Sequence, residues 1–106
     1  MKKITIAEIR EDLSNIKYYY SRKKKFDVNF GNTGINDVFQ LTEKYNLLAK
    51  KLKPKLYDIY IGLYVNNHTQ QSLANELGSS QSYVFQQNKI LVDYFYKKLN
   101  NEEKAS

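Results

Sequence analysis

The chain has 106 residues, of which 42% are apolar, so it is long enough to bury a single hydrophobic core in one compact domain. It contains no cysteine, which excludes disulfides, thiolate catalysis and metal sites with cysteine ligands. No apolar run approaches the roughly 20 residues that cross a bilayer, and no signal-peptide stretch follows Met1, so we expect a cytoplasmic protein of the bacterial host cell with no membrane partner.

The net charge is +6, and the positive charge lies toward the N-terminus. Residues 1–30 have eight Lys or Arg and four Asp or Glu, residues 31–68 have five and three, and residues 69–106 have four and four. The last third of the chain is therefore neutral, so attraction to phosphate must come largely from the other two thirds.

A first helix is predicted to begin at Thr5, because Thr5 and Glu8 have the spacing of a capping box. Apolar residues then recur every three or four positions, at Ile6, Ile9, Leu13, Ile16 and Tyr20. A basic block follows, which consists of Arg22, Lys23, Lys24 and Lys25. Two interpretations of this block stay open: it binds DNA phosphates or an acidic protein, or it is a solvated helix end that favours cations.

The segment from Gly31 to Gly34 predicts a connecting turn, because glycine and asparagine tolerate positive φ angles. A second helix is predicted over about 35–52. Its apolar positions are Ile35, Val38, Phe39, Tyr45, Leu48, Ala49 and Leu52, with Thr42 as an interruption. It ends before Pro54, since the residue before a proline resists the helical conformation.

A third helix is predicted to begin at Pro54, a residue that suits the first turn of a helix, and to end near 66–68. Its expected buried face is Leu56, Ile59, Tyr60, Leu63 and Tyr64. Four lysines surround the boundary between the second and third helices, at Lys50, Lys51, Lys53 and Lys55. For these lysines we favour the interpretation that they form a solvated surface.

Two further helices are predicted near the C-terminus, the first from Thr69 to Leu77 and the second from Ser80 to about Leu99. Thr69 and Ser80 are good N-caps, and Gly78 suits a left-handed turn between the two helices. No strand-like alternation persists anywhere, so the fold class is predicted to be all-α with about five helices. We expect an N-terminal scaffold over 1–53 and a C-terminal unit over 54–106, within one compact domain.

The spacing in the C-terminal unit is that of a helix-turn-helix, the motif that places a helix in the DNA major groove. Ala74 is small enough for close helix packing, Gly78 follows four residues later, and Val84 follows after six more. Leu73, Leu77 and Val84 are expected to face the interior of the helix pair. The alternative is a plain helical hairpin in a small bundle.

If the motif binds DNA, the start of its second helix enters the groove. The residues expected to contact bases or phosphates there are Ser80, Gln81, Ser82, Phe85, Gln86 and Lys89. Gln81 and Gln86 can each pair with adenine, and Phe85 is expected either to contact a thymine methyl or to be buried. Backbone phosphate is expected at the start of the first motif helix, at Thr69, Gln70 and Gln71.

Nothing in the sequence points to catalysis. His68 is the only histidine and lies in a polar turn, where a surface position is far commoner than a metal or catalytic one. No Ser/His/Asp set and no acidic magnesium site can be assembled from the pattern. We therefore expect no enzyme activity, no metal and no cofactor.

The segment Pro54–Leu99 resembles the fourth conserved region of bacterial sigma factors, in its Leu73-Ala74, Leu77-Gly78, Ser80 and Val84 pattern. The whole chain resembles the small sigma-like regulators of phages and mobile elements, of the ArpU and RinA type. The segments IKYYYSRKKKFD (Ile16–Asp27) and KLYDIYIGLYV (Lys55–Val65) are the parts most similar to that group. The resemblance implies promoter binding through a C-terminal helix-turn-helix and action on the transcription of phage genes.

Three functions follow as hypotheses. The first is a DNA-binding transcription regulator of a phage or mobile element, whose N-terminal helices provide dimerisation or contact with RNA polymerase. The heptad stripe of the first helix and the two-sided apolar surface of the last favour a homodimer in that case. The second is a helical module that binds RNA polymerase or another regulator without touching bases. The third is a phage packaging component, a class that usually forms large rings.

Overall fold

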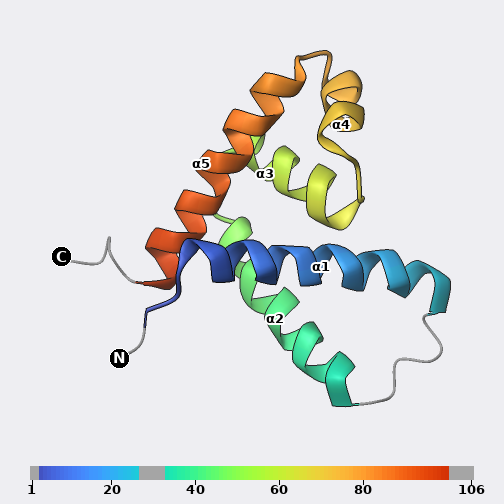
Figure 1. Ribbon diagram of the computed structural model, residues 1–106, viewed down its shortest axis with the longest axis vertical. Helices are drawn as coiled ribbons and strands as arrows, with labels where there is room; N and C mark the ends of the chain where they lie inside the picture. The colour runs from blue at the N-terminus through green and yellow to red at the C-terminus, as the bar shows by residue number, and fades with distance from the viewer. Residues whose placement is uncertain (1–2, 27–32, 101–106) are drawn as a thin grey trace.

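The fold is all-α, as predicted. The structure describes residues 3–26 and 33–100, and the side chains of 3–22 and 37–100. No strand occurs within these residues. Figure 1 shows the computed structural model. In chain order its elements are α1 (Ile6–Phe26), α2 (Thr33–Ala49), α3 (Pro54–Tyr60), the π-helix η2 (Ile61–Val65), α4 (Gln70–Leu77) and α5 (Gln81–Leu99). α1 crosses the middle of the molecule and packs against α2, η2 and α5 (Figure 1).

The start of α1 is fixed by the predicted capping box. The Thr5 amide donates to Glu8 Oε1 at 2.9 Å, and the Glu8 amide donates to Thr5 Oγ1 at 3.1 Å. The stripe that follows is buried at Ile9, Leu13 and Ile16, and Tyr20 is half-buried. Ile6 is 38% exposed, so the buried part of the stripe begins at Ile9, one turn later than predicted.

The second helix begins two residues earlier and ends three residues earlier than predicted. Gly34, expected in a turn, lies in α2, whereas 31–32 fall outside the described residues. At its end the hydrogen bonds shorten to the i−3 spacing, with the Leu52 amide donating to the Ala49 carbonyl at 3.0 Å. The tightened turn leads into the extended backbone of Lys53 before the proline.

Two side chains of α2 also correct the predicted apolar face. Phe39 is exposed, whereas Thr42, expected to interrupt the face, is buried. Burial of the Thr42 hydroxyl is tolerated because it donates to the Val38 carbonyl one turn earlier, at 2.8 Å.

The third helix does not continue as an α-helix but widens into η2. The Asn66 amide donates to the carbonyl of Ile61, five residues earlier, at 2.8 Å. At Gly62 a Cβ atom would lie 2.5 Å from Leu73 Cδ1, so any other residue requires the Leu73 side chain to move. The widened turn and the glycine together bring α4 against the core.

Aromatic side chains fill the centre of the core, where the ring centroids of Tyr45 and Tyr60 lie 4.9 and 5.8 Å from that of Phe95. Their hydroxyls are paired: Tyr45 donates to Asp12 Oδ2 at 2.7 Å, and Tyr60 donates to Asn46 Oδ1 at 2.6 Å. Burial raises the pKa of both hydroxyls, and the Asp12 carboxylate raises the pKa of Tyr45 further. The tyrosines therefore combine apolar packing with polar links between helices.

The two ends of the described chain are joined by side-chain hydrogen bonds. The amide of Ile4 donates to Asn100 Oδ1 at 2.9 Å, and Asn100 Nδ2 donates to the Ile4 carbonyl at 3.0 Å. No helix in the described part of the chain is long and apolar enough to span a membrane.

The two apolar stripes on which the homodimer hypothesis rested are used inside the chain. Ile9, Leu13 and Ile16 of α1 are buried in the core, and so are the apolar residues on both sides of α5, Val84, Leu91, Val92 and Phe95. These buried residues are not available to a second copy in this fold, whereas Ile6 of α1 and Phe85 of α5 stay exposed.

Candidate nucleic-acid interface

The α4–α5 pair begins at a capped helix start. Thr69 Oγ1 accepts a hydrogen bond from the Ser72 amide at 3.0 Å, as expected for an N-cap. His68 lies beside this cap, where its Nδ1 atom hydrogen-bonds the Ser72 hydroxyl. Leu73 and Ala74 are buried as predicted, but Leu77 is 41% exposed, which corrects its expected place inside the pair. The helix ends at Leu77, so this side chain lies at the rim of the contact with α5.

The turn between the two helices depends on Gly78. Its φ and ψ angles are 68° and 33°, the left-handed conformation, and its amide donates to the Asn75 carbonyl at 3.3 Å. A Cβ atom here would meet nothing within 4 Å, so the requirement for glycine is conformational. Ser80 then caps α5, because its hydroxyl accepts from the Tyr83 amide at 3.1 Å.

One side of α5 is fixed against the rest of the molecule. Val84, Leu91 and Phe95 are buried, and Asn88 is 6% exposed. Tyr64 of η2 donates its hydroxyl to Asn88 Oδ1 at 2.6 Å, a link that sequence reasoning missed because both residues looked like parts of separate helix faces. Burial raises the pKa of Tyr64, and the bond to Asn88 opposes that shift. The back of α5 is thereby held in one orientation.

The opposite side of α5 faces solvent at its N-terminal end. All six residues predicted to contact DNA are exposed: Ser80, Gln81, Ser82, Phe85, Gln86 and Lys89. Phe85 is 48% exposed, so the interpretation that placed it in the core is wrong. The Lys89 ammonium lies 5.6 Å from the centre of the Phe85 ring. These side chains form one row along the first turns of the helix.

The start of α4 adjoins this row. Gln70, which is half-buried, lines a shallow depression of about 230 Å³ together with Gln81, Ser82 and Phe85. Gln71 is exposed and bonds Asn75 Oδ1 at 3.2 Å, and the Thr69 hydroxyl is occupied by its cap. Gln70 therefore lies next to the α5 row, whereas the side chains of Thr69 and Gln71 form hydrogen bonds within α4.

The segment that precedes α4 is hydrogen-bonded to α1. Asn67 has a positive φ angle of 62°, and its side-chain amide donates to the Lys17 carbonyl at 3.2 Å. Lys17 Nζ in turn donates to the carbonyl of His68 at 3.2 Å. The asparagine pair at 66–67 was read from the sequence only as a helix end, and nothing local indicated its partner 50 residues earlier.

The basic block at the end of α1 lies apart from the turn between α4 and α5 (Figure 1). Arg22 is half-buried, and its guanidinium carbon lies 5.3 Å from the centre of the Tyr18 ring. Lys23, Lys24 and Lys25 belong to the last turns of α1, but their side chains fall outside the described residues. The structure therefore does not join this block to the α5 row.

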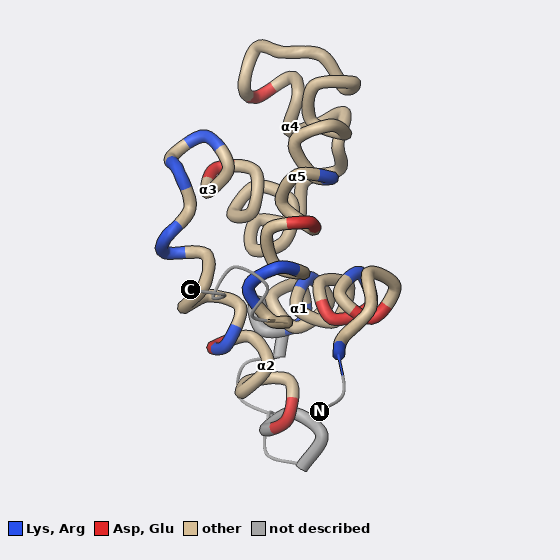
Figure 2. The backbone as a smooth tube through the Cα atoms, turned by 90° about the vertical axis from the view of Figure 1, so that its left-hand side faces the viewer, with Lys and Arg blue, Asp and Glu red and all other residues tan. Residues whose placement is uncertain are grey.

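Charge is nearly absent from the α4–α5 pair. Between Asp58 and Asp93 the sequence has two charged side chains, Glu76 and Lys89, if His68 is neutral. Figure 2 shows this end of the molecule almost entirely without blue or red. A surface of this kind offers hydrogen bonds and apolar contact, but little attraction to phosphate.

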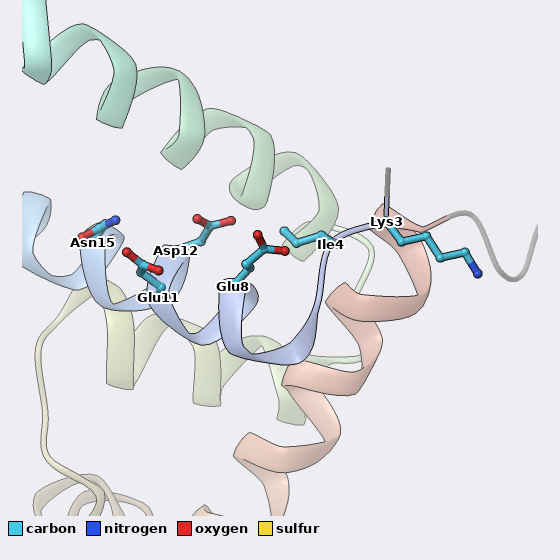
Figure 3. Close-up of a pocket in the computed structure, with 6 residues that line it drawn as sticks. All are labelled: Lys3, Ile4, Glu8, Glu11, Asp12 and Asn15. Atoms are coloured by element: carbon cyan, nitrogen blue, oxygen red, sulfur yellow. The ribbon is translucent and has the colours of Figure 1, made fainter. Parts of the chain in front are cut away.

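A groove along α1 has the opposite character. Figure 3 shows the carboxylates of Glu8, Glu11 and Asp12 in a row along α1, beside Asn15. Glu8 serves the capping box and Asp12 accepts from Tyr45, so two of the three acids have structural roles. The described residues contain no group of His, Cys, Asp or Glu that could hold a metal ion.

Comparison with known proteins gave no relative: no family model, no curated protein and no solved structure matches this chain.

Proposed function

We propose that the chain is a DNA-binding transcription regulator of a phage or mobile element and contacts promoter DNA through the first turns of α5. The observation that supports this best is the solvent-facing row Gln81, Ser82, Phe85 and Gln86, directly after a glycine turn and beside the start of α4. An exposed row of this kind at a helix N-terminus has the geometry with which a recognition helix enters the major groove.

The chemistry of the row matches base edges better than it matches phosphate. A glutamine side chain can make two hydrogen bonds to adenine at once, because its Nε2 donates to N7 and its Oε1 accepts from the N6 amino group. The apolar Phe85 ring is suited to a thymine methyl group, and Lys89 to a phosphate or a guanine. We therefore expect a preference for sites that contain A·T pairs.

Rigid support from behind makes this assignment stronger. Val84 packs in the core, and Asn88 is held by the Tyr64 hydroxyl, so the exposed row cannot rotate without breaking buried contacts. A side chain that must meet a base edge within hydrogen-bonding distance benefits from a helix fixed in this way.

Selection of bound sequences from random duplex DNA tests the proposal, with the wild type compared with the Gln81→Ala, Gln86→Ala double variant. The wild type should enrich an A·T-containing sequence, and the variant should lose that preference while it stays folded. Gln40→Ala, the same change on the exposed face of α2, is the matched control and should leave the enriched sequence unchanged. No enrichment by the folded wild type, or an identical sequence from the double variant, would refute base contact by α5.

A second function is favoured by one observation, the exposure of Phe85 and Ile90 at 48% and 49% on a nearly neutral surface. Such a surface suits a protein partner, for instance RNA polymerase, as well as it suits DNA. In that case Phe85→Ala would abolish binding to the protein partner, and the chain would enrich no DNA sequence in the same selection.

A further inference from the structure

A second group of positive charges, besides the basic block of α1, lies at the corner between α2 and α3. It consists of Lys50, Lys51, Lys53 and Lys55, which we call the lysine corner (Figure 2). All four side chains are exposed, and within the described residues none has an ion-pair or hydrogen-bond partner. Four like charges within six positions repel one another, so the fold gains no stability from their proximity.

Two of these lysines are also badly placed for helix stability. Lys53 is the N-cap residue of α3 and makes no side-chain cap, and Lys55 follows in the first turn. The N-terminus of a helix has a partial positive charge, so it favours acids and disfavours cations. Lys50 and Lys51 follow the C-terminus of α2, where cations are favourable, but that accounts for only half of the corner. The sequence-based interpretation of a merely solvated surface leaves Lys53 and Lys55 unexplained.

The position of the corner relates it to the proposed DNA site. α3 packs directly against α5, and η2, which continues α3, packs against α4. The protein measures 40 × 36 × 22 Å, whereas one turn of duplex is already about 34 Å long. α3 meets α5 at Phe95, so a duplex that runs from the first turns of α5 past α3 would bring its phosphates to the lysine corner.

We infer that the lysine corner is the phosphate-binding surface of the protein and supplies most of the salt-dependent affinity for duplex DNA. This inference rests on the proposed function, and it assigns base recognition and phosphate binding to two different surfaces. The neutral α5 row discriminates between bases, and the corner attracts the phosphate backbone without regard to sequence. The neutrality of the α4–α5 pair is then no obstacle to DNA binding, because the charge lies on the adjoining element.

Affinity for a fixed duplex, measured over a range of salt concentrations, tests the inference. Each phosphate contact contributes about 0.9 to the slope of log K against log salt, so Lys53→Gln, Lys55→Gln should lower that slope by between about one and two. Affinity should fall by the same factor for every sequence, and the sequence enriched by selection should not change. Lys53→Arg, Lys55→Arg should keep the slope, which shows that charge and not folding is responsible.

The matched control is Lys3→Gln, Lys44→Gln, an equal loss of charge on exposed side chains before α1 and within α2, which should change the slope little. The inference is overturned if the corner variant and the control lower the slope equally. It is also overturned if the corner variant loses binding to anionic phospholipid vesicles while duplex binding is unchanged. A lowered slope together with an unaltered preference in Gln81→Ala, Gln86→Ala would support the corner and refute the α5 assignment.

Discussion

At the residue scale, two glycines are required for different physical reasons. Gly78 ends α4 in the left-handed conformation with open space around it, so its role is a matter of backbone angle. Gly62 has no unusual φ angle, but Leu73 occupies the volume that a side chain would need. The first glycine sets the turn before α5, and the second sets the distance between η2 and α4.

Gly62→Ala should lower the free energy of unfolding by about 1–3 kcal/mol, because the new methyl group overlaps the Leu73 side chain. In a Leu73→Ala background the same substitution should cost much less, since the clashing atoms are gone. Gly78→Ala should cost about 1–2 kcal/mol in both backgrounds, because its cost is backbone strain. Urea unfolding of the four Gly62 and Leu73 combinations measures the coupling. Equal costs of Gly62→Ala in both backgrounds would contradict the packing account.

Residue roles that depend on local sequence were predicted correctly, whereas those that depend on tertiary neighbours were not. The caps at Thr69 and Ser80 follow from residue type and position alone, and both hydrogen bonds are present. The bond between Tyr64 and Asn88 and the brace between Asn67 and Lys17 join residues 24 and 50 positions apart. No periodicity within one helix indicates such partners.

At the element scale, the sequence placed the five α-helices of the described residues, because apolar spacing and capping residues act locally. The starts of α3, α4 and α5 agree with their predicted positions at Pro54, Thr69 and Ser80. The end of α2 and the π-helical turn were missed. Both depend on whether an amide bonds the carbonyl three, four or five residues earlier. Local apolar spacing does not determine that choice.

Exposure along α5 was predicted only in part from its apolar pattern. Val84, Leu91, Val92 and Phe95 are buried, which leaves the glutamine row as the exposed N-terminal surface of α5. Phe85 belongs to the row and not to the core, and the sequence could not decide between the two because either choice fits a helical period. The structure therefore shows which residues of α5 are exposed at the candidate site, whereas the sequence left Phe85 undecided.

At the scale of the whole molecule, buried tyrosine hydroxyls connect the helices. Tyr45 links α2 to α1, Tyr64 links η2 to α5, and Tyr94 of α5 donates to the Leu48 carbonyl of α2 at 2.8 Å. These bonds require the protonated phenol as donor. Stability should therefore depend on pH in the alkaline range, where unfolded tyrosine ionises.

Burial raises the pKa of Tyr45, Tyr60 and Tyr64 in the folded chain, whereas tyrosine in the unfolded chain ionises at about pH 10. Their stabilising contribution is thus complete below about pH 10 and is lost as the pH rises above it toward the raised folded values. The free energy of unfolding in urea should fall in that range, and less steeply in Tyr45→Phe. Tyr18→Phe, a change at an exposed tyrosine, should leave the slope unaltered. Identical slopes for the wild type and Tyr45→Phe would contradict this expectation.

The central claim is that glutamines at the start of α5 contact adenine, and replacement of that adenine tests it most directly. The duplex obtained by selection is synthesised with 7-deazaadenine, which lacks the N7 acceptor, at each A·T position in turn. At one position or more, wild-type affinity should fall by about tenfold, and the Gln81→Ala, Gln86→Ala variant should show no such loss there. An equal loss in wild type and variant at every position, or no loss in the wild type, would contradict the account.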